Sequence, residues 1–275
     1  MQVILLADGL GTRISEESYL KPKPMIEIGE KPILWHIMKH YDYYGFKNFT
    51  ICCGYKQEMI REWFSNYLLH NKRIMAINTS MNNTLGYYDK GSIENWSIFA
   101  VNTGLNTPTG ERIKMLADPR YIDKYSRSYS IEEKLLGNEG NFLMTYGDGV
   151  SDVNLKELIK FHKKNNKLVT MTLVHPRGRF GAVNIDKNGL LMDFREKSIG
   201  DDGWVNSGYF VINKKALKYI KKGEFWEKEP MQRLIKQKEA VGYKHTGFWH
   251  CLDNLRDKND LNKLWETTKP WKIWI

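Results

Sequence analysis

The stretch "QVILLADGLGTR" (residues 2–13) decides the fold class, because it joins an unbroken apolar run to a glycine loop. Such a run is typical of a strand buried on both faces of a sheet. Residues 32–45, "PILWHIMKHYDYYG", follow with apolar residues at helical spacing between a proline start and a glycine stop. Residues 48–55, "NFTICCGY", indicate the next strand. Strand, helix and strand predict a βαβ unit, and therefore a parallel sheet covered by helices.

The same alternation resumes in the second half of the chain. The expected elements are a strand at 141–150, a helix at 154–165, a strand at 168–174, a hairpin at 183–194 turning at Asn188-Gly189, a strand at 209–213 and two helical stretches beyond it, the first within 213–224. We therefore expect one α/β domain over residues 1–275, with a Rossmann-like, mixed and mostly parallel sheet flanked by helices. Hairpin elaborations and surface insertions near 70–95 and 116–140 complete it.

Composition excludes several classes of protein. The chain has 275 residues, 41% of them hydrophobic, which is ample for a large core. No window approaches the roughly 18 apolar residues of a membrane helix, so we expect a cytoplasmic protein with no membrane partner. Of the three cysteines, Cys52 and Cys53 lie in a predicted strand and are expected to pack in the core. His36 and His40 lack the glutamate of a zinc-binding helix, so metal binding there is not expected.

The formal net charge of +10 raises nucleic acid as a partner. The basic residues are scattered, however, and no RNA-binding aromatic pattern or zinc-finger spacing accompanies them. An anionic small substrate explains a positive field equally well. We therefore expect no nucleic-acid partner.

The glycine loop points to phosphate binding at the carboxyl edge of the sheet, where open α/β sheets bind ligands. Gly9 and Gly11 let the backbone approach a ligand closely, and exposed N–H groups in such a loop form an anion site. The loop is not a P-loop, because no G-K-[ST] follows. It is not the dinucleotide fingerprint either, because Ile14 stands where the third glycine would fall.

Two cations follow the loop. Arg13 offers a planar fork of donors suited to phosphate oxygens, and Lys23 is held between Pro22 and Pro24, each of which fixes its own φ. A polar turn followed by solvated lysines is the alternative. The ordered set after a buried strand favours a loop that surrounds a triphosphate.

Two acidic residues suggest a metal. Asp148 follows a predicted buried strand in "TYGDG", and Asp253 lies in "HTGFWHCLDNLRD". Mg²⁺ prefers one or two carboxylates together with phosphate oxygens. Each aspartate, taken alone, also fits a helix cap or a turn.

These motifs, with "KPKPMIEIGEKPI", "GRFGAVNI", "FREK", "NSGYFVI" and "GFWHCLDNLRDK", resemble the bacterial glucose-1-phosphate cytidylyltransferases. That family is a branch of the sugar-1-phosphate nucleotidyltransferases, whose fold is GT-A-like. The resemblance implies that CTP and α-D-glucose 1-phosphate give CDP-glucose, for surface polysaccharide such as O-antigen, and pyrophosphate. It implies Mg²⁺ as cofactor, in-line attack on the α-phosphate, and a homo-oligomer, namely a hexamer.

The resemblance also implies roles for residues at matching positions. Those expected to act in catalysis are Arg13, Lys23 and Asp148. Those expected to hold the nucleotide are Leu6, Ala7, Asp8, Gly9, Leu10, Gly11, Thr12, Arg13, Lys23, Gly147 and, donated across a subunit contact, Thr107 and Arg112. Those expected to face the sugar phosphate are Tyr146, Glu196, Lys197 and Asn206. Asp148 and Asp253 are expected to hold the metal. Trp271 and Trp274 are expected to pack on the chain's own surface or at a subunit contact.

Two positions depart from the family pattern: Ser198, a mild change in a loop, and Asp8, where the family usually has glycine. A carboxylate within about 4–6 Å of a triphosphate repels it unless a cation or donor intervenes. Asp8 can cap the next turn, accept a hydrogen bond from the ribose or base and alter base choice, or weaken nucleotide binding. The alternatives to the main function are therefore the same chemistry on another sugar 1-phosphate or nucleotide, and a low-activity nucleotide-binding relative.

Overall fold

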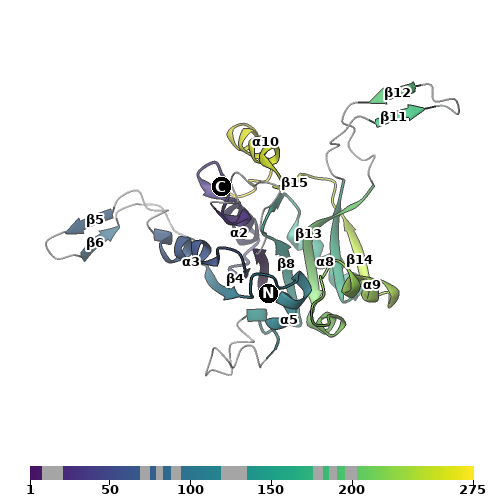
Figure 1. Ribbon diagram of the computed structural model, residues 1–275, viewed down its shortest axis with the longest axis horizontal. Helices are drawn as coiled ribbons and strands as arrows, with labels where there is room; N and C mark the ends of the chain where they lie inside the picture. The colour runs from purple at the N-terminus through teal and green to yellow at the C-terminus, as the bar shows by residue number, and fades with distance from the viewer. Residues whose placement is uncertain are drawn as a thin grey trace.

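The N-terminal apolar run forms β1 (Val3–Ala7), a strand whose residues are all buried. It lies near the middle of a seven-stranded sheet in a computed structural model, which describes residues 1–7, 21–68, 75–78, 83–87, 94–118, 135–175, 182–185, 191–195 and 203–275 (Figure 1). The other strands of this sheet are β4 (Asn48–Cys53), β7 (Ser97–Asn102), β8 (Asn141–Tyr146), β10 (Val169–Val174), β13 (Val205–Asn213) and β14 (Ala240–Lys244). Their order is β14-β10-β13-β8-β1-β4-β7.

The sheet is mostly parallel, as predicted. β1 runs parallel to both β4 and β8, β4 to β7, and β10 to β14. Only β13, among these strands, is antiparallel to its neighbours β8 and β10. The predicted βαβ unit is confirmed, because α2 (Ile33–Tyr43) connects β1 to its parallel neighbour β4.

Alternation along β1 divides its side chains between two cores. Val3 and Leu5 belong to one buried cluster, and Ile4 and Leu6 belong to the other. A strand sends successive side chains to opposite faces, so an all-apolar strand serves two layers at once.

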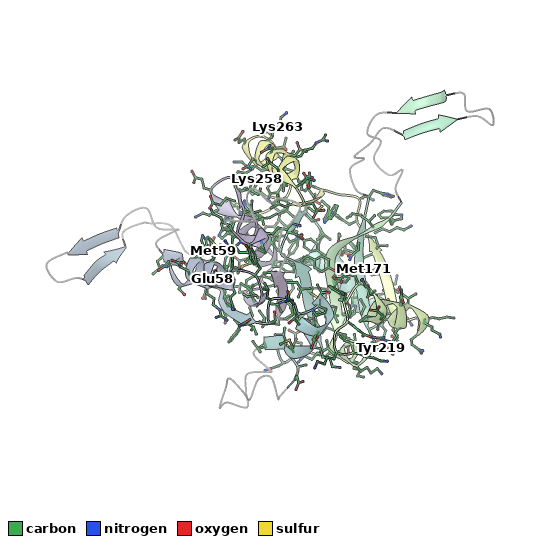
Figure 2. All side chains as sticks on the ribbon, viewed as in Figure 1. Glu58, Met59, Met171, Tyr219, Lys258 and Lys263 are labelled. Atoms are coloured by element: carbon green, nitrogen blue, oxygen red, sulfur yellow. The ribbon has the colours of Figure 1, made fainter. Side chains whose placement is uncertain are left out.

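Helices cover both faces of the sheet. The first cluster takes side chains from α2, α3 (Gln57–Ser65), α8 (Leu155–Asn165) and α10 (Leu255–Glu266). The second takes them from α5 (Thr109–Met115), η3 (Lys214–Tyr219) and α9 (Glu229–Lys236). Figure 2 shows the described side chains of the sheet and of the surrounding helices on the ribbon. No helix in the part of the chain described here is long and apolar enough to cross a membrane.

Small elements elaborate this frame. They are η2 (Lys23–Met25), β2 (Glu27–Ile28) paired with β3 (Lys31–Pro32), β5 (Met75–Asn78) paired with β6 (Asn83–Tyr87), β9 (Gly149–Ser151) paired with β15 (Trp249–Cys251), and β11 (Ala182–Ile185) paired with β12 (Leu191–Arg195). The pairing of β11 with β12 confirms the predicted hairpin, whose turn lies outside the described residues. The single-domain prediction, with its two insertions, stays a prediction.

The helix expected within 213–224 differs from the prediction. Residues Lys214–Tyr219 form a 3₁₀ helix, in which the Asn213 side chain accepts a hydrogen bond from the Lys215 N–H. Buried Leu217 and Ile220 fix its position, and Gly223 has a positive φ of 78°. Short helical segments often take this tighter form.

The two adjacent cysteines are buried, as predicted, and so are two histidines for which no burial was predicted. Cys52 and Cys53 are fully buried in β4. His36 and His40 are also buried, and each donates an Nε2–H to a main-chain oxygen, of Ile28 at 2.8 Å and of Val153 at 2.9 Å. These contacts are structural.

Trp271 and Trp274 pack on their own chain. Trp271 is only 1% exposed, and its ring lies 5.9 Å from that of His36, which also contacts Trp265 at 4.5 Å between centroids. The interpretation that these tryptophans pack on the chain's own surface is confirmed, and their burial needs no subunit contact.

Burial of the two histidines makes the fold sensitive to acid. Burial lowers the pKa of His36 and of His40 from 6.5 to about 4. Between about pH 6.5 and pH 4, these two histidines are therefore protonated in the unfolded chain but stay neutral in the folded protein. Each histidine then costs about 1.4 kcal/mol of stability per pH unit.

We expect the free energy of unfolding, measured by urea titration at pH 7, 6 and 5, to fall along this slope. In the variant His36→Gln, the part of this pH dependence that the two histidines cause should fall by about half. If the free energy of unfolding fell with pH as steeply in His36→Gln and in His40→Gln as in the wild type, this account would be contradicted.

Candidate active site

The candidate site lies where the chain changes direction across the sheet. From β1 the strand order continues to β4 and β7 on one side, whereas β8 returns to the other side of β1. The carboxyl ends of β1 and β8 are adjacent, with Leu6 paired to Tyr146. Ligands of open α/β sheets bind outside such a switch point. The glycine loop follows β1 here, and "GDG" follows β8.

Lys23 is held rigidly beside this point. It begins η2, between Pro22 and Pro24, and its side chain is largely buried. Main-chain bonds from the Met25 N–H to the Pro22 oxygen (2.8 Å) and from the Ile26 N–H to the Lys23 oxygen (3.1 Å) close the turn.

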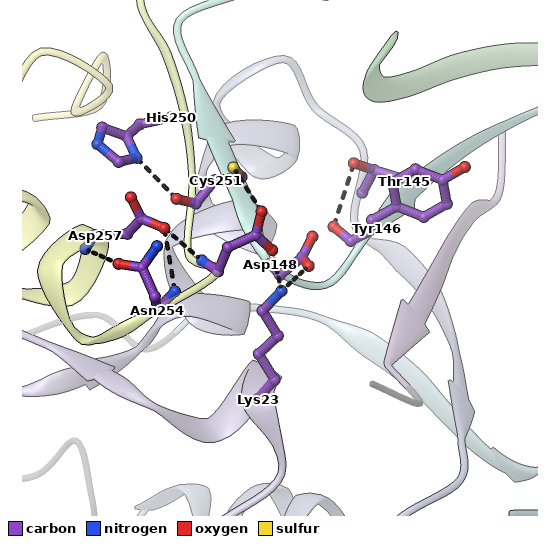
Figure 3. Close-up of polar contacts among 9 residues, drawn as sticks. Lys23, Thr145, Tyr146, Asp148, His250, Cys251, Asn254 and Asp257 are labelled. Carbon is purple, nitrogen blue, oxygen red and sulfur yellow. Dashed lines mark hydrogen bonds and ion pairs between the residues drawn. The ribbon is translucent and has the colours of Figure 1, made fainter. Parts of the chain in front are cut away.

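The Lys23 ammonium joins two aspartates from distant parts of the chain. Its Nζ donates to Asp148 Oδ2 at 2.6 Å and to Asp253 Oδ1 at 2.8 Å (Figure 3). Burial acts to lower the pKa of Lys23, but the two carboxylates outweigh it and raise the pKa above 10.5. The lysine is therefore a fixed positive charge at neutral pH. The structure thus brings together three residues that the sequence suggested separately.

A short ribbon carries both carboxylates. Asp148 immediately precedes β9, and Asp253 follows β15 by two residues; Gly149 pairs with Cys251 in the ribbon. The Leu252 N–H also donates to the Asp148 main-chain oxygen at 2.8 Å. Pairing of these two segments therefore sets the separation of the two side chains.

Gly147 allows the β8 loop to approach β1 closely. Its N–H donates to the Leu6 oxygen at 2.9 Å. A Cβ at this position would lie 3.0 Å from that same oxygen and 3.0 Å from Pro24 Cγ. Any side chain at this position would press on β1 and on the lysine loop, so glycine suits the point where these segments meet the Asp148 loop.

Tyr146 belongs to a polar network that sequence reasoning missed. Its hydroxyl donates to Glu227 Oε1, while Glu227 Oε2 accepts from Thr109 Oγ1 at 2.7 Å. Burial, with Glu227 nearby, raises the pKa of Tyr146 well above 10, so the hydroxyl stays protonated. Glu227 carries no sequence signal of this role, because its partners lie 81 and 118 residues away.

Arg112 holds a loop of its own chain. It is 1% exposed and donates to Thr103 Oγ1 at 2.5 Å, the Leu105 oxygen at 3.1 Å and the Cys53 oxygen at 3.4 Å. These contacts shape the 103–105 turn, ahead of Thr107. The expected nucleotide contacts of Arg112 and Thr107 stay predictions.

The remaining predicted residues divide into two groups. The side chains of Leu6 and Ala7 are buried in β1, which limits them to main-chain contacts with a ligand, and Asn206 uses its Oδ1 to accept the Gly208 N–H at 2.8 Å. The predicted residues that lie outside the described ranges are Asp8, Gly9, Leu10, Gly11, Thr12, Arg13, Glu196 and Lys197.

Residues 2–92 and 112–263 match the family described as nucleotidyl transferase. The chain belongs to the nucleotidyl transferase family. It is 43% identical to the glucose-1-phosphate cytidylyltransferases of Salmonella typhimurium and of Salmonella typhi, over 276 residues that span 100% of each chain. The crystal structure of HddC from Yersinia pseudotuberculosis has the same fold, with a TM-score of 0.59 at 20% identity over 96% of this chain and 99% of that one.

Members of the nucleotidyl transferase family generally use a divalent metal ion. The donors at this site fit such an ion, because carboxylate oxygens of Asp148 and Asp253 converge on one cation, the Lys23 ammonium. Cys251 lies beside Asp253, but burial and the nearby carboxylates raise its pKa to about 12, so it stays a thiol. Among the described residues, no group of three or more His, Cys, Asp or Glu side chains is arranged so that it could hold a metal ion by itself. Two carboxylates completed by phosphate oxygens suit a hard divalent cation.

The close approach at Gly147 predicts a sensitive variant of this nucleotidyl transferase. In Gly147→Ala, the added methyl would push Pro24, and with it Lys23, a few tenths of an ångström from the Asp148 loop. Misplacing a reacting group by about 1 Å costs about a hundredfold in rate, so a smaller shift should cost about tenfold. We expect kcat to fall on that smaller scale while the protein stays folded at the assay temperature.

Gly140→Ala is a matched control, since among the described residues a Cβ there meets only Asn213 Nδ2, at the ordinary contact distance of 3.9 Å. Normal turnover in Gly147→Ala would contradict the assignment of this contact.

Proposed function

We propose that this chain transfers a cytidylyl group from CTP to α-D-glucose 1-phosphate and releases CDP-glucose and pyrophosphate. One observation carries the proposal: a buried lysine bridges two aspartates at the switch point of a nucleotidyl transferase fold. The full-length identity of 43% to glucose-1-phosphate cytidylyltransferases supports the choice of substrates.

The chemistry requires positioning and charge compensation, with no covalent intermediate on the protein. An oxygen of the sugar phosphate attacks the α-phosphorus of CTP in line, and pyrophosphate leaves. Lys23 has three N–H donors, two of which bind carboxylates, so its permanent charge can also serve a phosphate oxygen. It would offset negative charge that develops at phosphorus.

The proposed metal is Mg²⁺, held by Asp148 and Asp253, where it would screen the phosphates of the two substrates from each other. The glycine loop and Arg13 are proposed to bind the triphosphate. Tyr146, Glu196, Lys197 and Asn206 are proposed to face the sugar phosphate.

Two further properties belong to this proposal. A nucleoside triphosphate substrate favours the cytoplasm as the place of action. The resemblance to the cytidylyltransferases favours a homo-oligomer, a hexamer, in which the segment containing Thr107 contributes to a neighbouring site. Leu105, 52% exposed, is an apolar side chain that such a contact would cover. Sedimentation equilibrium tests the oligomer.

Removing the Lys23 charge is the direct test of the site. We expect Lys23→Ala to lose at least about a hundredfold in kcat, the scale for one well-placed electrostatic contact. Lys21→Ala is the matched control. It removes an equal charge two residues before Lys23, where the ammonium forms a surface ion pair with Glu27. Surface pairs contribute little, so this control should stay close to wild type. Turnover of Lys23→Ala near the wild-type rate would refute the assignment.

Substrate choice is tested by pyrophosphate release with glucose 1-phosphate and each of CTP, UTP, dTTP, ATP and GTP. We expect release with CTP. Release with another nucleotide instead would implicate Asp8 in base choice. An Asp8→Gly variant should then regain the use of CTP as substrate. If no pyrophosphate were released with any of these nucleotides, or with other sugar 1-phosphates, the proposed activity would be contradicted.

A further inference from the structure

Asp257 lies buried at the start of α10, next to the candidate site (Figure 3). Its Oδ2 accepts the Asn254 N–H at 3.1 Å, and Asn254 Oδ1 accepts the Asp257 N–H at 3.0 Å. This reciprocal pair is a capping box, which satisfies N–H groups that a helix start leaves without partners.

The same carboxylate does more than cap the helix. Its Oδ2 also accepts the Asp253 N–H at 2.9 Å, one residue outside the capping box. A capping box needs only the contact with Asn254. The additional bond ties Asp257 to the main chain of the residue whose side chain binds Lys23.

Asp253 is therefore fixed from both directions along the chain. On its N-terminal side, the Leu252 N–H donates to the Asp148 oxygen at 2.8 Å, next to the β9–β15 ribbon. On its C-terminal side, the helix start holds it through Asp257. A residue fixed on both sides has little freedom to move its carboxylate relative to Asp148.

A buried carboxylate at this place is costly, because it adds negative charge close to two other aspartates. Asp257 is 7% exposed and contributes to the raised pKa of the Cys251 thiol. The N–H groups and dipole of the helix start compensate its charge. The second contact of this side chain, with the Asp253 N–H, gives its oxygen a purpose beyond capping the helix.

We propose that Asp257 is a positioning residue, which holds the Asp253 carboxylate opposite Asp148 at the separation that Lys23 now bridges. The inference deepens the proposed function and rests on it, since it assigns this separation to the binding of a divalent cation with a nucleotide.

The test compares Asp257→Ala, Asp257→Asn and Asp260→Ala. Asp260 is an exposed acid three residues further along the same helix, so its removal matches the loss of charge. Asparagine keeps an oxygen that can accept both N–H groups, whereas alanine does not. For each variant we would measure kcat and KM, thermal unfolding, and the affinity for Mn²⁺ in the presence of CTP by electron paramagnetic resonance.

We expect Asp257→Ala to weaken Mn²⁺ binding and to lower kcat at least about tenfold each, the scale for removing a group that orients a metal ligand. Asp257→Asn should recover most of both losses, and Asp260→Ala should behave as wild type. Equal losses in Asp257→Asn and Asp257→Ala would overturn the proposal. It would also be overturned if Asp257→Ala lowered only the unfolding temperature.

The Mn²⁺ measurement needs no turnover, which separates the two proposals. If the wild type bound Mn²⁺ with CTP but released no pyrophosphate, the proposed function would fail. Weaker Mn²⁺ binding in Asp257→Ala, with recovery in Asp257→Asn, would still support the positioning role.

Discussion

The active-site region depends on one buried positive charge. Lys23 comes from the N-terminal loop, Asp148 from the end of a central strand and Asp253 from the segment before the last helix. An ammonium taken out of water without partners costs several kcal/mol, and two carboxylates this close repel each other without a cation between them. Each of the three groups therefore makes the placement of the other two favourable. The ion pairs also explain why a loop, a strand end and a helix start meet at one point.

Main-chain contacts give this charge cluster its rigidity. Gly147 bonds to β1, Leu252 bonds to the Asp148 oxygen, and the ribbon of β9 and β15 joins the two acidic segments. Side-chain oxygens then complete the frame at the helix start. A site built in this way needs little reorganisation when charge develops on a substrate, which is the condition for electrostatic catalysis.

Local patterns in the sequence were sufficient for most of the fold. The buried run of β1, the apolar spacing of α2 and the lysine between two prolines are signals within a few residues, and each was found. Contacts between distant residues have no such signal, so neither the meeting of Lys23 with Asp253 nor the bond from Tyr146 to Glu227 could be derived. Burial also gives a residue partners that no local pattern indicates, since the Arg112 guanidinium donates to the Thr103 hydroxyl and the Leu105 oxygen. Asn254-x-x-Asp257 is a local capping pattern that could have been recognised.

The packing of Trp265 and Trp271 around His36 has a consequence for the order in which parts of the protein fold during synthesis. His36 lies in the first helix after the Lys23 loop, and its Nε2–H holds the Ile28 oxygen of the segment that follows Lys23. The rings that enclose it, Trp265 and Trp271, are synthesised more than 200 residues later. A nascent chain can form β1, α2 and β4 early, because their contacts are local. Lys23 stays without its second carboxylate until residue 253 has left the ribosome. The candidate site is therefore among the last parts of the molecule to assemble, and a chain that ended before residue 253 would lack one of the two carboxylates that bind Lys23.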